Sequence, residues 1–533
     1  MAGTSNQKTD FSAGTEFQPS GQWTPLKELV VLILILAAAM AARWPFRHVV
    51  LVRDEGEYVY LAQQILQGAT PYLDVYNQKT PFVFYLMSFF QLLVGRDLVA
   101  LHMATAVYGL LSTVVLYLFT RRLFGQIAAI GAALAFNVMT FDQCGVAHSA
   151  STEFFMLLWI TVAIDLWYRG STSGRWWLTL LSGMAAGMAY QTKQTGMAVI
   201  AFLVIERVWA RIRSGPPDCW SKTVKDIALS TGGFIVVLCA VMLFFASRGA
   251  LAQYIECTWT NNWQYVGRRQ EGPGRIFKLA WIAIMIVARW DVGLWLWGSI
   301  GLIVHACKRG SGRGNGLWIL LALFAAAALA AGSPFVHYYE PLIVPLAIGT
   351  GITLSILCTR LACATRLSAT LLYAMLLLIP WIWPAIHWIS YPLMTASEWT
   401  SLNKVLPHMG IAPRIGKYMA EQTTPDESFL VIGSEPEIYY YANRRACTRL
   451  VFTFPVIGPY SYSPRLQEEF RRDFDNRNHR YVVVMSAFLT EWPEHQAGFL
   501  TPYVKILQEK YELERTFFHE GRDIAWVFRR KEK

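Results

Sequence analysis

The sequence predicts a polytopic α-helical membrane protein with a small α/β domain in its C-terminal part. Three observations lead to this fold class. Hydrophobic residues make up 54% of the 533 residues, and charged residues only 16%, against roughly 25% in ordinary soluble domains. Apolar runs near the length of a bilayer span recur through the first three quarters of the chain. The last part instead alternates short apolar runs with polar helical stretches.

About eleven transmembrane helices are predicted between residues 25 and 390. The first 24 residues are polar, and we expect them to form a disordered cytoplasmic segment. The candidate spans are residues 26–43, 98–120, 126–141, 153–168, 176–191, 196–210, 227–247, 291–306, 317–331, 340–358 and 368–388. Two shorter apolar stretches, 81–94 and 275–288, each border a polar loop, so we interpret them as interfacial or re-entrant helices.

The distribution of positive charge predicts the orientation. Residues 1–388 contain 28 Lys and Arg against 18 Asp and Glu, whereas residues 389–533 contain 19 against 18. Short cytoplasmic loops carry Lys and Arg. With the N-terminus in the cytoplasm, eleven helices place Arg121 and Arg122 in a cytoplasmic loop and the C-terminal domain outside. The charge-balanced domain offers no basic patch, which argues against nucleic-acid binding.

The C-terminal domain, residues 391–533, is predicted to be a small extracytoplasmic α/β domain. Its expected strands are 427–433, 480–486 and 523–530, with a short helix at 436–445 and helical stretches near 413–423 and 502–513. It contains no glycine-rich phosphate loop. The eight cysteines of the chain have neither pairing nor metal-ligand spacing, so no disulfide framework or structural zinc is expected.

The predicted topology gathers several polar segments at one end of the helices, outside the cytoplasm. They are residues 44–80, 141–153, 190–196, 247–275 and 332–341. Charged residues between membrane segments are costly, so they indicate function more strongly than the same residues on a soluble surface. We therefore expect a site built from these loops, which lipids reach from the side.

The first polar loop contains three acids close together, Asp54, Glu55 and Glu57, and a lone cation, Lys79. Apolar residues at helical spacing from Tyr58 onward predict an amphipathic helix on the membrane surface. In one interpretation Asp54 caps this helix and Glu57 closes a capping box. In the other, Asp54 is a general base that takes the proton from an attacking hydroxyl. Capping alone explains neither Glu55 nor Lys79.

Cations in these loops have two interpretations each. Lys79 either reaches the membrane interface from the start of a helix or stabilises a departing phosphate. Lys193 is either a plain turn residue or a half-buried cation that needs an anion, which a lipid phosphate would supply. Arg268 and Arg269 either bind phosphate or anchor the chain at the membrane interface.

Two further loops carry polar candidates. His148 and Glu153 flank a helix start, where Glu153 could also belong to a cap. An aromatic belt explains Tyr338, but it does not explain the neighbouring His337. No metal motif of the HExxH, paired-Cys or DxD kind is found. Asp54 and Glu55 could hold a divalent ion, although the sequence does not require one.

Four motifs in residues 25–345 resemble membrane glycosyltransferases with the GT-C fold. The likeness is to the bacterial glycosyltransferase family 39 branch, related to protein O-mannosyltransferases and to the lipid A aminoarabinose transferase. The motifs are DEGEYVYLAQQILQGATPY, NQKTPFVFYL, TRRLFGQIAAIGAAL and QTKQTG. In the tail, GSEPEIYYYANRRACTR looks like a segment that follows the last span in many bacterial members.

This resemblance implies an inverting transfer of a sugar from a polyprenyl-phosphate carrier to an acceptor outside the cytoplasm. The acceptor would be a cell-envelope glycolipid, polysaccharide or protein, and the location the bacterial inner membrane. By motif position, Asp54 is the implied base, and Lys79 and Lys193 are implied contacts of the carrier phosphate. Some relatives carry an arginine where Glu57 stands, and some carry an Asp in the second extracytoplasmic loop. These departures leave the sugar and the acceptor open.

The competing hypothesis is a transporter or flippase for a lipid-linked or polar solute. Transporters place polar residues near the bilayer midplane on broken helices, and many have two related halves. Here the charges cluster at helix ends on one face, and no second half is visible, which favours the enzyme. The predicted catalytic residues are Asp54 and Glu55, and the predicted contacts of carrier phosphate and sugar are Lys79, Lys193, His337, Tyr338, Glu153, His148 and Arg269.

Overall fold

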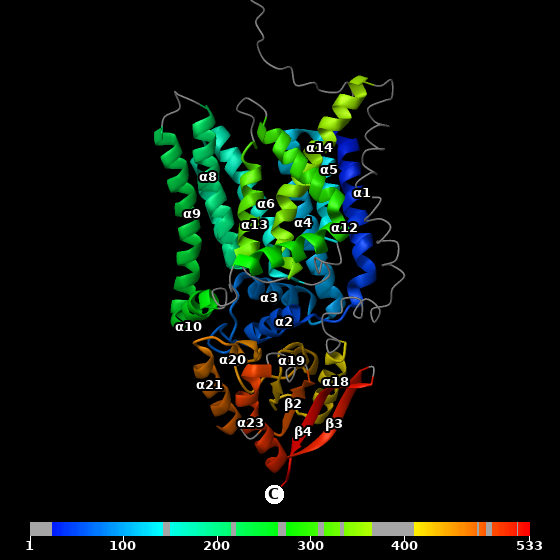
Figure 1. Cartoon of the computed structure of the whole chain (residues 1–533), viewed down its shortest axis with the longest axis vertical. Coiled ribbons are helices and arrows are strands. Elements are labelled where there is room, and N and C mark those ends of the chain that lie inside the picture. The colour runs from blue at the N-terminus through cyan, green and yellow to red at the C-terminus, as the bar shows by residue number, and fades with distance from the viewer. Residues whose placement is uncertain are drawn as a thin grey trace, which may run out of the picture.

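The computed structural model describes residues 24–141, 150–214, 220–264, 273–307, 314–330, 335–364, 410–476, 479–486, 493–519 and 521–532. A bundle of long helices makes up most of this structure, and a smaller domain with a sheet lies beyond one end of it (Figure 1). The span predicted at 368–388 and the domain boundary predicted near residue 390 lie outside the described residues.

Each of the other ten predicted spans contains a helix. These are α1 (Pro25–Arg43), α4 (Leu98–Phe124), α5 (Gln126–Met139), α6 (Thr152–Ser173), α7 (Trp176–Thr192), α8 (Met197–Ser214), α9 (Trp220–Ser247), α12 (Pro273–Cys307), α13 (Leu317–Ala330) and α14 (Ile343–Ala364). In the described part, four helical stretches are long and apolar enough to cross a membrane: Pro25–His48, Leu98–Phe124, Trp220–Ser247 and His337–Leu361. The total of eleven spans stays a prediction.

The interpretation of residues 275–288 as a separate interfacial helix is wrong. They belong to α12, a continuous helix of 35 residues. The polar residues Arg289 and Asp291 interrupt the apolar run, but neither breaks a helix. At 1.5 Å per residue α12 is about 52 Å long, well beyond the ~30 Å hydrocarbon thickness of a bilayer.

Small residues let the helices of the bundle approach closely. A Cβ atom added to Gly301 of α12 would lie 1.9 Å from the carbonyl oxygen of Gly349 on α14. Backbone contact of this kind is common between transmembrane helices, where small residues replace large side chains at the interface. Immediately before α14, the 3₁₀ helix η5 (Val336–Leu342) reaches the end of the bundle where the polar loops meet.

The polar loops form short elements at that end, which we call the loop end. They are η1 (Trp44–His48), α2 (Arg53–Leu66), α3 (Phe82–Val94), η3 (Gln194–Gly196), α10 (Leu251–Ile255) and the π-helix η4 (Glu256–Asn261). Helices α2 and α3 lie across the bundle, between it and the C-terminal domain (Figure 1). Every residue of α2 from Glu55 to Gln64 is buried. Helix α2 is therefore enclosed by protein, which corrects its interpretation as a surface helix.

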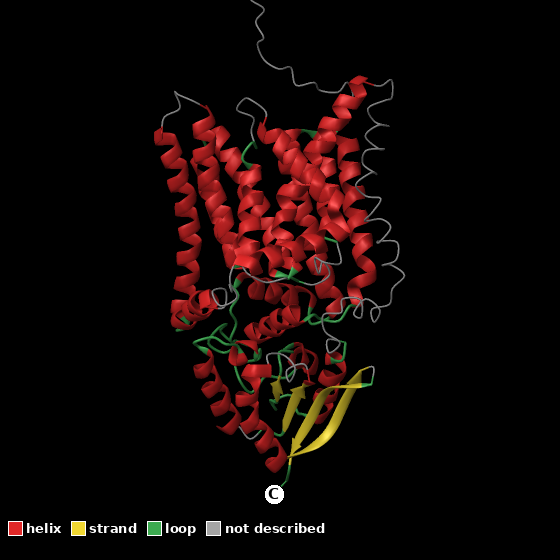
Figure 2. Ribbon diagram, in the orientation of Figure 1, coloured by secondary structure: helices red, strands yellow, loops and turns green. Residues whose placement is uncertain are grey.

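The C-terminal domain contains a four-stranded sheet in the order β1-β2-β4-β3 (Figure 2). Strands β1 (Leu430–Ile432) and β2 (Tyr481–Met485) are parallel, and β4 (Arg522–Arg530) is antiparallel to β2 and to β3 (Tyr511–His519). The three predicted strands are confirmed, but the helix predicted near 502–513 overlaps the first residues of β3. The helices are α18 (Ala412–Gln422), α19 (Glu437–Ala442), α20 (Phe454–Ile457), α21 (Ser463–Asn476) and α23 (Pro493–Lys510).

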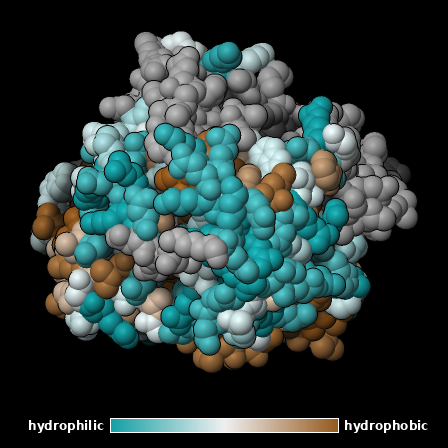
Figure 3. Space-filling view, turned by 90° about the horizontal axis from the view of Figure 1, so that it is seen from below, coloured by the Kyte–Doolittle hydropathy of each residue, from teal (hydrophilic) through white to brown (hydrophobic). Residues whose placement is uncertain are grey.

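The outer face of this domain suits an aqueous environment. Seen from the domain side, hydrophilic side chains cover the centre of the molecule, and hydrophobic ones gather toward its rim (Figure 3). The bundle itself exposes many large apolar side chains, among them Leu243 and Leu111. Such surface is stable against lipid rather than water. The protein is therefore an integral membrane protein whose polar domain lies beyond one end of the bundle.

Candidate active site

The motif DEGEY lies in the first turns of α2, and its four side chains have different surroundings. The N-cap of α2 is Val52, which makes no side-chain cap hydrogen bond. Asp54 follows two positions later and contacts Lys79 instead. The interpretation of Asp54 as the helix cap is therefore wrong, and its carboxylate pairs with Lys79 rather than with the helix backbone.

Lys79 bridges two of the acids. Its Nζ lies 2.9 Å from Asp54 Oδ2 and 3.5 Å from Glu57 Oε2, and 4.5 Å from the centre of the Tyr58 ring. The chain around Lys79 is held locally, because its backbone N–H donates to Asn77 Oδ1 at 2.9 Å. The cation is thus fixed between two carboxylates rather than reaching toward the membrane interface.

The two acids beside Lys79 differ in exposure and in pKa. Burial raises the pKa of Asp54, but the positive charges of Lys79, His337 and Lys193 outweigh burial and lower it to about 2. Because 44% of the Asp54 side chain is exposed, solvent screens part of this attraction. The Glu57 side chain is only 6% exposed, and burial raises its pKa to about 7 despite the nearby Lys79. Asp54 is the permanent anion of the pair.

A second cluster lies where α6, the 190–196 turn and η5 meet. Lys193 donates to Glu153 Oε1, and its Nζ lies 3.9 Å from the centre of the Tyr338 ring. His337 Nε2 lies 3.9 Å from the same oxygen of Glu153. Ser151 caps α6 by accepting from the Phe154 N–H, so Glu153 is free of a capping role. Glu153 supplies the anion that Lys193 was expected to need.

The two clusters belong to one site. The positive charge of Lys193 helps to lower the pKa of Asp54, as does that of His337 when this histidine is protonated. The neighbouring turns also touch, because Gln194 Nε2 donates to the carbonyl oxygen of Gln78 at 2.8 Å. The structure thus brings together six predicted site residues: Asp54, Lys79, Glu153, Lys193, His337 and Tyr338.

Glu55 has different partners from Asp54. Its Oε1 lies 3.2 Å from His102 Nε2 and accepts from the Ala150 N–H, also at 3.2 Å. Within the described residues, no group of three or more His, Cys, Asp or Glu side chains could hold a metal ion. A divalent ion at Asp54 and Glu55 stays a prediction. His148 and Arg269, like Arg268, lie outside the described residues.

Sequence reasoning missed three residues of this region. Asn77 and Tyr58 shape the surroundings of Lys79, and His102 is the partner of Glu55. A lone histidine in an apolar span is a usable signal, since polar groups there need partners. Asn77 and Tyr58 carried no signal beyond their closeness in sequence to Lys79 and to the acids.

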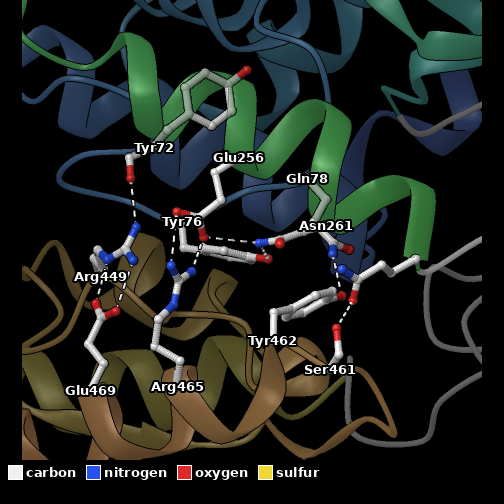
Figure 4. Close-up of polar contacts among 11 residues, drawn as sticks. Tyr72, Tyr76, Gln78, Glu256, Asn261, Arg449, Ser461, Tyr462, Arg465 and Glu469 are labelled. Carbon is white, nitrogen blue, oxygen red and sulfur yellow. Dashed lines mark hydrogen bonds and ion pairs between the residues drawn. The ribbon is translucent and has the colours of Figure 1, made fainter.

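The C-terminal domain closes the loop end from the other side (Figure 4). Arg449 Nη1 donates to the Tyr72 carbonyl oxygen at 2.8 Å, and Gln78 Nε2 donates to the Tyr462 hydroxyl at 2.7 Å. Arg465 pairs with Glu256 of η4. Two of these contacts fall in residues 72–78, directly before Lys79, so the domain holds the loop that presents this cation.

Comparison with known families gives one match. Residues 78–251 match the family described as dolichyl-phosphate-mannose-protein mannosyltransferase. The matched range contains Lys79, Glu153 and Lys193. No curated protein matches the chain.

Solved structures resemble the chain over nearly its whole length. ArnT from Cupriavidus metallidurans bound to undecaprenyl phosphate is 15% identical, with a TM-score of 0.61 over 95% of this chain and 98% of that one. The apo state of the same protein is 16% identical, with a TM-score of 0.60 over 94% of this chain and 98% of that one. The Archaeoglobus fulgidus oligosaccharyltransferase in its apo form is 13% identical, with a TM-score of 0.55 over 87% of this chain and 70% of that one. At these identities the likeness establishes the fold, which is that of the GT-C membrane enzymes. Together with the family match, it identifies the chain as a membrane glycosyltransferase with the GT-C fold.

Proposed function

We propose that the protein transfers a sugar, with inversion, from a polyprenyl-phosphate carrier to an acceptor at the loop end, with Asp54 as general base. The ion pair of Asp54 and Lys79, 2.9 Å apart, is the observation that carries this proposal. A displacement at a sugar carbon needs a base for the attacking hydroxyl and a cation for the departing phosphate. The pair supplies both groups side by side.

Two lysines are assigned to the carrier phosphate. The turns that carry Lys79 and Lys193 are in contact, because Gln194 Nε2 donates to the Gln78 carbonyl oxygen at 2.8 Å, and both cations lower the pKa of Asp54. A fixed cation stabilises the negative charge that develops on a leaving phosphate. The undecaprenyl phosphate bound to ArnT, which shares this fold, supports a polyprenyl carrier here. We assign Arg269 to the same phosphate.

The donor itself would prepare the base. With Lys79 at 2.9 Å, the pKa of Asp54 is about 2, which makes Asp54 a weak proton acceptor. A phosphate that attracts Lys79 would weaken this ion pair and raise the pKa of Asp54. Asp54 would thus become a better base when the donor is in place, which links deprotonation of the acceptor to the presence of the donor.

The second cluster is assigned to the sugar. Glu153 and His337 offer hydrogen-bonding groups, and Tyr338 offers an aromatic face beside them. We assign His148 to the same subsite. Glu55 holds α2 against α4 through His102 in this proposal, beside its predicted catalytic role. The acceptor is a cell-envelope glycolipid, polysaccharide or protein.

The proposed location is the bacterial inner membrane, with the loop end and the C-terminal domain outside the cytoplasm. Arg121 and Arg122 lie in the last turn of α4, and α4 begins beside the loop end. This puts the two arginines at the opposite end of the bundle. Cytoplasmic loops are enriched in such cations, which supports this orientation.

The function can be tested with purified protein in proteoliposomes. A panel of undecaprenyl-phosphate-linked sugars is offered with envelope lipids, polysaccharides and proteins, and covalent products are detected by mass spectrometry. We expect transfer by the wild type. Movement of the carrier across the bilayer with no covalent product would instead indicate a flippase. Mass analysis of envelope glycolipids and glycoproteins from a deletion strain would identify the natural sugar and acceptor.

A further inference from the structure

The first turn of α2 is held by residues from the other end of the chain. Arg53 directly precedes Asp54, and its Nη2 lies 3.2 Å from Oε1 of Glu435 in the C-terminal domain. The Glu435 side chain is 1% exposed and that of Arg53 is 16% exposed. A charge pair so well shielded from water fixes its partners firmly, because breaking it leaves a buried charge without compensation.

Two residues further along the domain, Glu437 lies against Gly56. A Cβ atom added to Gly56 would lie 2.6 Å from the Cβ of Glu437, so only glycine allows this approach. Glu437 is fully buried, and its carboxyl oxygens have no hydrogen-bond partner on another described residue. Burial and the charge of Glu435 raise the pKa of Glu437 well above its usual value. A neutral acid can pack against the helix where a carboxylate would be disfavoured.

The same domain segment, residues 435–446, continues along α2. Asn443 Oδ1 accepts from Gln63 Nε2 at 2.7 Å, and the Ala446 N–H donates to the Tyr60 hydroxyl at 2.9 Å. These contacts lie farther along α2 than those of Arg53 and Gly56. The segment therefore follows the helix over several turns, and its acidic end meets the turn that carries Asp54.

We propose that Glu435 and Glu437 are positioning residues of the catalytic site, which hold the first turn of α2 so that Asp54 faces Lys79. Asp54 is 44% exposed, so its own packing fixes it poorly. Helix α2 also lacks a side-chain N-cap. In place of a cap, the Arg53–Glu435 pair and the Gly56–Glu437 contact hold the first turn. This inference rests on the proposed role of Asp54. It means that the C-terminal domain helps to position the catalytic base.

Kinetics of full-length variants test this inference. Glu435→Gln keeps the size of the side chain and removes the charge pair. Because small misplacements of a catalytic group are costly, we expect kcat to fall about 10- to 100-fold with the donor KM within about twofold of wild type. Gly56→Ala should act in the same direction. The exchange of charges in Arg53→Glu with Glu435→Arg should restore part of the lost kcat.

Arg465→Gln provides the matched control. It breaks another ion pair of the same interface, with Glu256 of η4, and does not touch α2. We expect near wild-type kcat. Wild-type kcat in both Glu435→Gln and Gly56→Ala would overturn the inference. An equal loss of kcat in Arg465→Gln would also overturn it, because domain docking in general would then be responsible.

Hydrogen–deuterium exchange separates this inference from the proposed function. If the wild type transferred no sugar, the proposed function would fail, but the hold on α2 could still be measured. Glu435→Gln should speed amide exchange in residues 53–58 relative to both wild type and Arg465→Gln. Equal exchange in all three proteins would overturn the inference whatever the activity.

Discussion

Lys79 Nζ lies 2.9 Å from Asp54 Oδ2, so the proposed phosphate partner and the proposed base form one ion pair. The loop that separates them in sequence folds back across α2, and the C-terminal domain holds it through Tyr72 and Gln78. The site is therefore an assembly of bundle, loop and domain rather than a property of the helices alone.

Replacement of Lys79 tests the phosphate assignment. Lys79→Met should lower kcat about 100- to 1,000-fold, as removal of one charge-stabilising group does in other enzymes. Lys79→Arg keeps the positive charge and should retain more activity. Steady-state transfer rates at saturating donor measure both. Full activity in Lys79→Met would contradict the assignment.

Glu57 predicts a pH dependence of donor binding. Its pKa is about 7, so it is neutral below this pH and negative above it. Ionised Glu57 adds a negative charge beside Lys79 and opposes a phosphate. The donor KM should therefore rise as pH increases through about 7, and Glu57→Gln should remove this rise. A kcat that instead falls below pH 7, and does so only with Glu57 present, would make Glu57 the base.

The pair of Lys193 and Glu153 predicts an effect on stability. Their side chains are 14% and 2% exposed. Lys193→Met leaves Glu153 buried without its cation, which should lower the free energy of unfolding by about 3–5 kcal/mol. The double variant Lys193→Met with Glu153→Gln should recover much of this loss. Thermal unfolding in detergent compares the two; equal midpoints for wild type and Lys193→Met would refute the pair's contribution.

The close approach of α12 and α14 at Gly301 predicts that a larger residue there destabilises the protein. Gly301→Ala places a Cβ atom 1.9 Å from the Gly349 carbonyl oxygen, so the helices must separate. We expect a loss of about 1–3 kcal/mol in stability. Gly232→Ala on α9 is the matched control, since its Cβ would meet nothing within 4 Å. If both variants unfold at the wild-type temperature, the close approach is not important for stability.

Much of the site could be predicted because it depends on local chemistry and on sidedness. Asp54 and Lys79 stand out as charges between apolar segments, and the charge distribution put Lys193 and His337 at the same end. Glu153 was predicted too, but Lys193 was expected to pair with a lipid phosphate, and its partner in the structure is Glu153. Pairing of this kind depends on how α6 and α7 pack, which no local pattern records.

The remaining errors have different physical causes. No role was predicted for Gly56, yet Glu437 packs against it from the C-terminal domain. The helix predicted near residues 502–513 runs into the start of β3, where pairing with β4 makes the chain a strand. Residues 275–288 were predicted to be a separate helix because they are short for a span and border a polar loop, but the helix continues through them.

The replacement of Asp54 by asparagine tests the proposed mechanism most directly. Asp54→Asn keeps the size of the side chain and removes the base, and Asp74→Asn, an exposed acid of the same loop, is its control. In proteoliposomes with the donor that the wild type uses, we expect Asp54→Asn to lose transfer by about 100-fold or more, with intact folding and donor binding. Asp74→Asn should stay active. Transfer by Asp54→Asn at the wild-type rate would contradict the assignment of Asp54 as the base.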